Sequence, residues 1–287
     1  MTTPTRPEEA AMLKTCCANL YESDWARLLL GDSFHPGGLT LTERLGTWLE
    51  LGPGRRLLDV ASGKGASAIF LAQRFGCEVV GVDYGAQAIA EATLAAERAG
   101  VADRVCFKQG DAESLLFDDG EFDAVICECA FCTFPDKQAA AAEFARVLKP
   151  GGRVGLSDLT RSGALPEELD SLLAWIACLA DARPIDEYAA YLQYAAFTVE
   201  RIEPHDHALA NMVTSIRTKL LGAELMVKLK QVDLPGADFE QAKRMARAAA
   251  EAVREGKLSY AIIVGAKASN SSGFFAGLTF QRLEGVK

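Results

Sequence analysis

The stretch that decides the fold is Leu57-Leu58-Asp59-Val60-Ala61-Ser62-Gly63-Lys64-Gly65. It begins as an apolar strand with an acid near its end, and then breaks into a loop of small residues. A helix is predicted to follow over residues 66–75. Glycines in such a loop leave bare backbone that a ligand can approach, and the start of a helix offers unpaired N–H groups. The stretch therefore predicts a strand, a ligand-cradling loop and a helix.

Three similar units follow along the chain. Residues 78–83 predict a second strand that ends in Asp83, which follows Asp59 by 24 residues. An acid at this point suits a bidentate hydrogen bond to ribose hydroxyls. Residues 105–112 predict a third strand ending in Gly-Asp-Ala, and residues 122–127 predict a fourth.

The remaining elements continue the alternation of strands and helices. A helix is predicted over 136–148, with residues 149–152 as its stop, and a fifth strand over 153–158. The later elements are predicted as helices 165–179 and 185–196, strand 197–203, helices 205–231 and 239–255, and strand 258–268, antiparallel at the sheet edge. The fold class is α/β, a doubly wound, seven-stranded and mostly parallel sheet.

We expect one domain over residues 1–287. Within it we expect a helical cap, a cofactor-binding half, a substrate-side half and a tail, at residues 11–50, 51–160, 161–268 and 269–287. The long helices after residue 205 exceed what the sheet needs, and an extra packing layer, a lid and a dimer surface stay open. At the sequence His205-Asp206-His207 we expect a strand-to-helix junction with Asp206 as the cap, because adjacent side chains on a helix diverge.

Composition excludes several classes of function. A net charge of −9 and a pI of about 5.0 argue against a nucleic-acid partner, because phosphate binding needs clustered lysine and arginine. The first ten residues are polar and resemble no signal peptide, and no run of about 20 apolar residues predicts a membrane span. We expect a cytoplasmic protein that acts on a small molecule; a homodimer stays open.

The spacing of these strand-end motifs resembles the class I S-adenosylmethionine-dependent methyltransferases. The resemblance implies a Rossmann-like fold with S-adenosyl-L-methionine as cofactor. It implies that the loop after the first strand cradles the amino acid part of the cofactor, with Ala61 in place of the usual first glycine. It also implies that Asp111 lies beside the adenine amino group, and Glu128 is a candidate to hold the ammonium group. The predicted cofactor-binding residues are Asp59, Ala61, Ser62, Gly63, Gly65, Asp83, Tyr84, Gly110, Asp111, Ala112 and Glu128.

Cysteine is the second signal, with eight in the chain. Without secretory features we expect reduced thiols rather than disulfides. Cys77, Cys106 and Cys127 fall on or beside predicted strands and are expected to be small buried hydrophobes. Cys129 and Cys132 follow the fourth strand, whose carboxyl end faces the ligand crevice of such a sheet.

The order of Cys129, Cys132 and Cys178 resembles that of arsenite methyltransferases. The resemblance assigns Cys129 or Cys132 to one arsenic-binding position and Cys178 to another. A third cysteine of that family, ahead of the first strand, has no counterpart in residues 30–35. Whether Cys16 or Cys17 joins the site or the two form an N-terminal surface pair stays open. The thiols fit ordinary pocket-lining residues equally well.

The reaction class expected is an in-line displacement at the sulfonium methyl, in which the protein mainly positions the nucleophile. A thiol-bound metalloid would attack through its own lone pair, and Cys129, Cys132 and Cys178 are then the candidate site residues. A hydroxyl acceptor needs a base, for which Asp158 and His35 are the candidates. No metal site is expected. An O-, N- or C-methyltransferase of metabolites and a non-catalytic cofactor sensor remain as alternatives.

Overall fold

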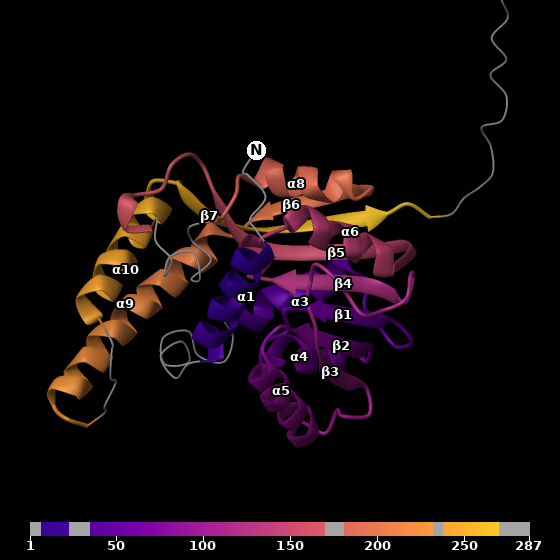
Figure 1. Ribbon diagram of the computed structural model, residues 1–287, viewed down its shortest axis with the longest axis horizontal. Coiled ribbons are helices and arrows are strands. Elements are labelled where there is room, and N and C mark those ends of the chain that lie inside the picture. Colours follow the sequence, from indigo (N-terminus) through magenta and orange to yellow (C-terminus); the bar gives the residue numbers. More distant parts are fainter. Residues whose placement is uncertain (1–6, 23–34, 170–180, 232–237, 270–287) are drawn as a thin grey trace, which may run out of the picture.

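Seven strands form one twisted sheet with helices on it (Figure 1). The computed structural model describes residues 7–22, 35–169, 181–231 and 238–269. The strand order is β3-β2-β1-β4-β5-β7-β6. The strands are β1 (Arg56–Val60), β2 (Glu78–Asp83), β3 (Val105–Gln109), β4 (Phe122–Glu128), β5 (Leu148–Arg161), β6 (Phe197–Pro204) and β7 (Leu258–Lys267).

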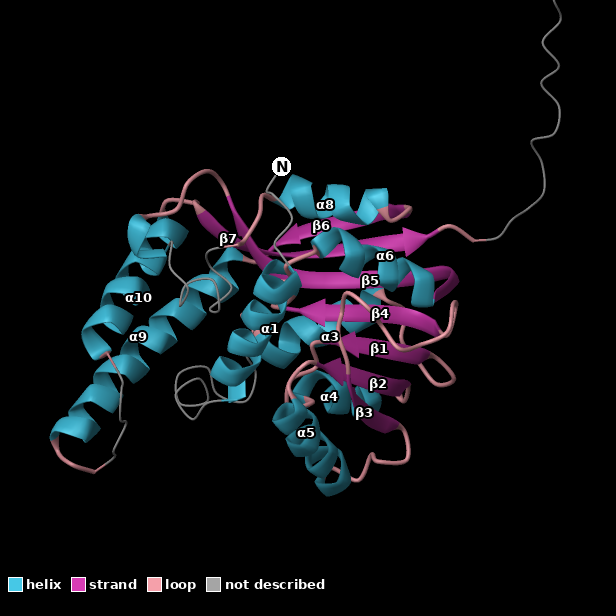
Figure 2. Ribbon diagram, in the orientation of Figure 1, coloured by secondary structure: helices cyan, strands magenta, loops and turns pink. Residues whose placement is uncertain are grey.

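The described helices alternate with the strands (Figure 2). The α-helices are α1 (Pro7–Glu22), α3 (Gly38–Trp48), α4 (Ala66–Phe75), α5 (Ala86–Arg98), α6 (Lys137–Val147), α8 (Ile185–Tyr194), α9 (Asp206–Lys228) and α10 (Phe239–Arg254). Two short 3-10 turns are η1 (Phe131–Thr133) and η2 (Glu167–Leu169). The strand-and-helix alternation expected for an α/β fold is confirmed.

The centre of the sheet is apolar on both faces. Leu57 and Leu58 of β1 and Val125 and Ile126 of β4 are fully buried. Such continuous apolar runs are typical of parallel strands covered by helices on both sides. The first five strands in the spatial order are parallel.

The strand order reverses between β1 and β4, and this reversal places the ligand crevice. From β1 the chain moves outward through α4 and α5 to β3, and it then returns to β4 and moves the other way through α6. Right-handed crossovers put helices on opposite faces when the direction of travel reverses. A crevice opens at the carboxyl ends of the strands at such a switch point.

Strand β7 is antiparallel, as expected, but it does not lie at the sheet edge. It pairs with β5 on one side and β6 on the other. The prediction that β7 lies at the edge was wrong, and β6 is the edge strand. A position between two strands suits β7, because Tyr260, Ile262 and Ile263 are buried and an edge would expose part of this apolar run.

Smaller expectations also need correction. Helix α6 ends at Val147, just before the predicted stop at residues 149–152. Strand β5, however, begins at Leu148 instead of the expected residue 153, and a register shift between Phe122 and Ala124 of β4 absorbs the extra residues. Asp206 does not cap α9: it is the first helical residue, and its carboxylate accepts from the backbone N–H of Tyr260 at 3.3 Å. Most of the helix expected over 165–179 lies outside the described residues. Cys106 is exposed, because its side chain leaves the sheet on the open face of β3.

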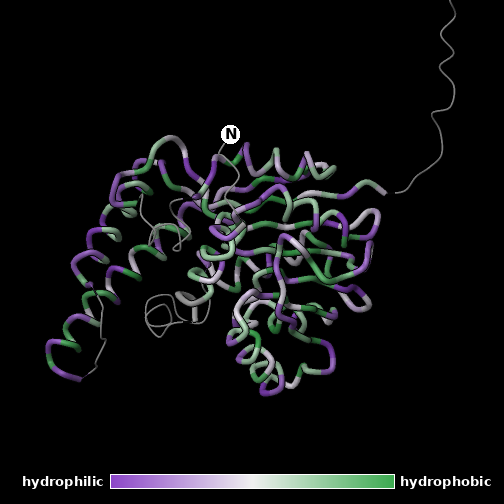
Figure 3. The backbone as a smooth tube through the Cα atoms, in the orientation of Figure 1, coloured by the Kyte–Doolittle hydropathy of each residue, from purple (hydrophilic) through white to green (hydrophobic). Residues whose placement is uncertain are grey.

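The long helices α9 and α10 pack against each other and meet β7 at one end. Figure 1 shows the pair running outward past the sheet, and Figure 3 shows hydrophilic residues along much of both helices. None of the helices in the described ranges is both long enough and apolar enough to span a bilayer.

Candidate functional site

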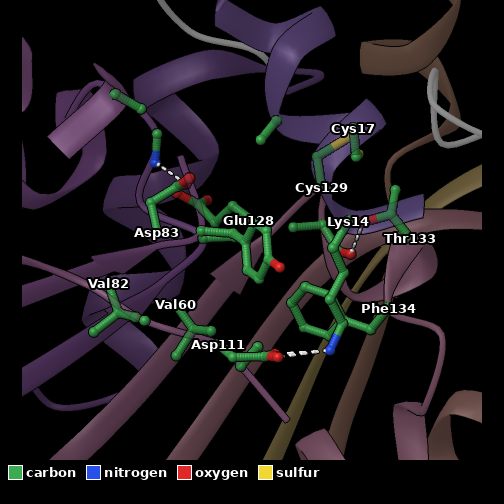
Figure 4. Close-up of a pocket in the computed structure, with 18 of the residues that line it drawn as sticks. Lys14, Cys17, Val60, Val82, Asp83, Asp111, Glu128, Cys129, Thr133 and Phe134 are labelled. Atoms are coloured by element: carbon green, nitrogen blue, oxygen red, sulfur yellow. Dashed lines mark hydrogen bonds and ion pairs between the residues drawn. The ribbon is translucent and has the colours of Figure 1, made fainter. Parts of the chain in front are cut away.

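A cavity of about 150 Å³ lies at the carboxyl ends of β1, β2, β3 and β4 (Figure 4). The loops after these four strands form its floor and walls. Helix α1 covers it with Lys14, Cys17 and Ala18. The cavity therefore occupies the switch point of the sheet, where the strand order predicts a ligand.

The cavity brings together most of the residues proposed from the sequence. Those that line it are Ala61, Gly63, Asp83, Tyr84, Gly110, Asp111, Ala112, Glu128 and Cys129. Other proposed residues lie outside its lining, namely His35, Asp59, Ser62, Gly65, Cys132 and Asp158. Cys178 lies outside the described residues.

The loop after β1 presents its backbone to the cavity at Gly63. This residue has φ of +51°, and a Cβ atom added there would meet nothing within 4 Å. Gly65 is different, because a Cβ there would lie 2.5 Å from the Phe107 ring. Ala61 keeps a left-handed φ of +59°, although this conformation favours glycine. Gly63 is thus the open point of the loop, and Gly65 makes room for Phe107.

Asp83, at the end of β2, fixes the loop and faces the cavity. One carboxylate oxygen accepts from the N–H of Gly63 at 2.8 Å, and the other accepts from the N–H of Gly85 at 2.8 Å. Each carboxylate oxygen has a second acceptor site. The backbone therefore orients the side chain, and Asp83 lines the cavity, as the ribose hypothesis requires.

Glu128, at the end of β4, is held by hydroxyl groups. It accepts from Ser67 at 2.6 Å, from Thr42 at 3.0 Å and from Ser157 at 3.3 Å. His35 Nε2 lies 3.7 Å from it, and the Glu128 side chain is only 4% exposed. His35 is itself buried beside Thr42 at 3.3 Å. The structure therefore places His35 against the Glu128 carboxylate and not in the cavity lining.

Asp59 is buried next to Val60, which lines the cavity, and it lies close to the carboxylates of Glu128 and Asp83. Burial, followed by the negative charges of Glu128 and Asp83, raises the pKa of Asp59 well above its usual range. Its Oδ2 atom is buried without a hydrogen-bond partner among the described residues. A cation bound beside these three acids would relieve their mutual repulsion.

Asp111, after β3, contacts the covering helix. Its carboxylate accepts from Lys14 Nζ at 2.7 and 3.0 Å, and it also accepts from the N–H of Glu113 at 3.0 Å. The same lysine ammonium donates to Glu113 at 2.5 Å. This ion cluster joins α1 to the far end of the cavity.

Asp158, on β5, is buried, and its carboxylate accepts hydrogen bonds from two backbone N–H groups. It accepts from the N–H of Cys132 at 3.0 Å and from the N–H of Leu159 at 2.7 Å. It is 1% exposed, and Cys132 is fully buried. These contacts anchor η1 to β5. A role for Asp158 as a base stays a prediction.

The thiols divide into two groups. Cys129 and Cys17 both line the cavity, whereas Cys132 is packed in the core. Cys129 has a left-handed φ of +53°, and non-glycine residues in this conformation cluster at functional sites. In the described part of the chain, no three histidine, cysteine or acidic residues come together as a metal site.

Several lining residues were not proposed from the sequence. They are Lys14, Ala18, Lys64, Ala88, Ala130, Thr133 and Phe134, together with the apolar strand ends Val60 and Val82. The residues after Cys129 could have been found, because they share its strand-end position. No sequence signal marks Lys14, since its partner Asp111 is 97 residues away.

The comparisons with known proteins agree with this geometry. A family model described as "Methyltransferase domain" matches residues 57–152. The 27-O-demethylrifamycin SV methyltransferase of Amycolatopsis mediterranei is 30% identical over 218 residues, which cover 71% of this chain and 78% of that protein. The chain belongs to the class I S-adenosylmethionine-dependent methyltransferases. This membership confirms the family expected from the sequence.

Other relatives show how widely the family extends. The arsenite methyltransferase of Halobacterium salinarum is 32% identical over 164 residues, covering 55% of this chain and 41% of that protein. A putative sarcosine dimethylglycine methyltransferase from Galdieria sulphuraria shares the fold with a TM-score of 0.74 at 20% identity, covering 88% of this chain and 98% of that one. The first three curated relatives are matched over only 65%, 41% and 38% of their own lengths.

The cofactor of this family is S-adenosylmethionine, and the cavity residues fit it. Gly63 offers backbone with open space in front of it. Asp83 lines the cavity with a carboxylate that suits ribose hydroxyls, and Asp111 retains one acceptor site for an amino group. The buried carboxylate of Glu128 suits a positive charge of the cofactor. The combination of these groups, and not a single motif, makes the cavity fit the cofactor.

Proposed function

We propose that the chain transfers a methyl group from S-adenosylmethionine to a small organic acceptor. The observation that carries this proposal is the convergence of Gly63, Asp83 and Glu128, from the ends of three adjacent strands, on one cavity. Bound there, the cofactor supplies a methyl group on a sulfonium, which is already activated for displacement. The task of the chain is then to orient two reactants and exclude water.

Different residues of the cavity lining contribute to this task. Asp83 accepts from the Gly63 backbone at one wall of the cavity, and the hydroxyl-bound Glu128 holds a fixed negative charge in the same lining. Because Ser67, Thr42 and Ser157 already fix its carboxylate, Glu128 needs no rearrangement to face a cation. Such preorganised charge acts strongly where water is excluded.

The acceptor side supports an organic substrate. Ala130, Thr133 and Phe134 extend the cavity beyond Cys129. Apolar side chains with few polar groups are typical of small-molecule pockets. A relative that covers most of this chain is named for a methyl transfer to 27-O-demethylrifamycin SV, an organic acceptor.

Calorimetry with S-adenosylhomocysteine tests the cofactor half of the proposal. We expect the wild-type chain to bind, and we expect Asp83→Asn to bind at least about tenfold more weakly, since a charge-assisted hydrogen bond contributes roughly 1.5–3 kcal/mol. Incubation with methyl-labelled cofactor and a panel of phenols, amines, thiols and arsenite then identifies the acceptor class. Absence of binding to the wild-type chain would refute the proposal.

A trivalent metalloid acceptor is the second candidate function. The cavity-lining thiols of Cys17 and Cys129 favour it, together with the arsenite methyltransferase relative, because soft metalloids prefer thiolate ligands. The set proposed from the sequence, Cys129, Cys132 and Cys178, stays a prediction, with Cys132 in the core. Retained arsenite methylation in the Cys17→Ser, Cys129→Ser double variant would refute this candidate for the two cavity thiols.

A further inference from the structure

Lys14 is the point at which helix α1 meets the sheet over the cavity. Its ammonium donates to both carboxylate oxygens of Asp111 and to one of Glu113, at 3.0, 2.7 and 2.5 Å. The three donor positions of a lysine ammonium are therefore all used. The Lys14 side chain is only 14% exposed. We name Lys14, Asp111 and Glu113 the Lys14 clasp.

The clasp is stronger than an ordinary surface ion pair. Burial by itself lowers the pKa of Lys14, but the hydrogen bonds with Asp111 and Glu113 outweigh it, so that the pKa is raised. The pairs are partly shielded from solvent, with side-chain exposures of 33% for Asp111 and 13% for Glu113. Exposed ion pairs contribute little to stability, but shielded and hydrogen-bonded ones contribute more.

The clasp leaves Asp111 able to bind a ligand. A carboxylate has about four acceptor sites. Lys14 takes two of them and the N–H of Glu113 takes a third. One site on Oδ2 remains for a ligand donor. Lys14 therefore does not need to leave Asp111 when a ligand occupies the cavity.

Opening of helix α1 would widen the cavity for an entering ligand, because the helix forms one of its walls. The covered cavity measures about 150 Å³, whereas pockets for ligands of cofactor size are about 300–1,000 Å³. Lys14, Cys17 and Ala18 lie on the cavity side of α1. They lie on one face because residues three or four apart on a helix are neighbours. Opening of α1 breaks the clasp, and closing restores it.

We propose that the Lys14 clasp holds α1 closed over the adenosine end of the bound cofactor and sets the rate at which the cofactor and its product leave. This inference rests on the proposed function, because it takes the cavity as the cofactor site. Lys14 acts as a positioning residue, through Asp111 and the helix that carries it. Charge pairing between α1 and the loop after β3 thus controls residence time, whereas Asp83 and Gly63 control recognition.

The test compares Lys14→Gln with Thr15→Gln. Thr15 is the next residue of the same helix, is exposed, and bonds only within the helix, to the carbonyl of Ala11, in the described contacts. Stopped-flow displacement measures the dissociation rate of S-adenosylhomocysteine from each full-length variant. We expect Lys14→Gln to dissociate about fivefold or more faster than wild type and Thr15→Gln to match wild type. We expect Lys14→Arg, which keeps the charge, to restore slow release.

Salt dependence separates a clasp from a merely structural role. Raising ionic strength should speed release from the wild-type chain, because salt screens a partly exposed ion cluster. The Lys14→Gln variant should lose most of this dependence. A double-mutant cycle with Glu113→Gln should show that the two changes are not additive. Additive effects, or unchanged or slower release from Lys14→Gln, would overturn the proposal.

The reactivity of Cys17 gives a readout without cofactor. Cys17 lines the cavity on the underside of α1, so its alkylation by iodoacetamide, followed by mass spectrometry, reports opening of the helix. We expect faster labelling of Cys17 in Lys14→Gln than in wild type or Thr15→Gln. If the wild-type chain binds no S-adenosylhomocysteine, the proposed function fails. If it binds but its release does not respond to Lys14, the clasp alone fails.

Discussion

The two sides of the sheet use acids at strand ends in opposite ways. At the ends of β2, β3 and β4, the acids Asp83, Asp111 and Glu128 line the cavity. On β5, Asp158 is buried and bonds to the backbone of Cys132 and Leu159. All four residues are acids at or near the end of a strand. They differ in how deeply the side chain is buried and in which groups donate hydrogen bonds to it. An acid near the end of a strand thus lines the cavity only where the next segment leaves it facing the crevice.

The largest expected effect separates the two glycines of the loop after β1. Gly63→Val would place a side chain in the open cavity at φ of +51°, and we expect the affinity for S-adenosylhomocysteine to fall about a hundredfold or more. Gly65→Ala would bring a Cβ atom 2.5 Å from Phe107, and we expect a loss of about 1–3 kcal/mol in the free energy of unfolding. Calorimetry and urea titration measure the two effects. Equal affinity losses with no loss of stability would contradict the distinction.

The next contrast concerns Asp83 and Asp158. Asp83→Asn should weaken S-adenosylhomocysteine binding about tenfold to a hundredfold. Asp158→Asn should instead cost about 1–3 kcal/mol of stability, because a buried charge-assisted hydrogen bond is lost, and should change affinity little. The same calorimetric titrations and chemical denaturation distinguish these outcomes. A variant at Asp158 with normal stability and no turnover would instead identify that residue as the base.

A smaller contrast concerns the two cysteines after β4. Cys132 is fully buried among apolar residues, so Cys132→Ser should lower the free energy of unfolding by about 1–3 kcal/mol, since its hydroxyl lacks water. Cys129 lines the cavity, so Cys129→Ser should change the free energy of unfolding by less than about 0.5 kcal/mol. Urea unfolding of both variants provides the comparison. A larger loss for Cys129→Ser would mean that its thiol serves packing.

The last expected effect is a change in how the free energy of unfolding depends on pH, through Asp59. Its pKa is raised by burial and by Glu128 and Asp83, so the folded chain keeps a proton that the unfolded chain releases. This group therefore contributes stability below the ordinary aspartate range, and the contribution is lost as pH rises toward the raised pKa. Asp59→Asn should remove this loss, by at most about 1.4 kcal/mol per pH unit. Unfolding free energies of both proteins from pH 4 to pH 8 test it; parallel profiles would contradict it.

Much of the fold could be predicted because it depends on local signals. Helix α4 spans the predicted residues 66–75, and β2 spans the predicted 78–83, since each is bounded by glycine, an acid or a polar turn. The prediction that β7 lies at the sheet edge was wrong, because the order of strands in a sheet depends on contacts between segments distant in the sequence. The same reason explains Asp206, whose carboxylate bonds to Tyr260 instead of capping its helix.

The sequence by itself determined which residues stand at the ends of the strands. Asp83, Asp111 and Glu128 stand at or just after the ends of predicted strands, and alternation with helices places such ends along one side of a sheet. Only the tertiary structure decided what each of them faces. The Lys14 clasp joins residues 97 and 99 positions apart, and the burial of Cys132 beside the exposed face of Cys129 depends on how η1 folds back on β5. Exposure and charge pairing are properties of the packed chain, because they arise from neighbours that no local pattern specifies.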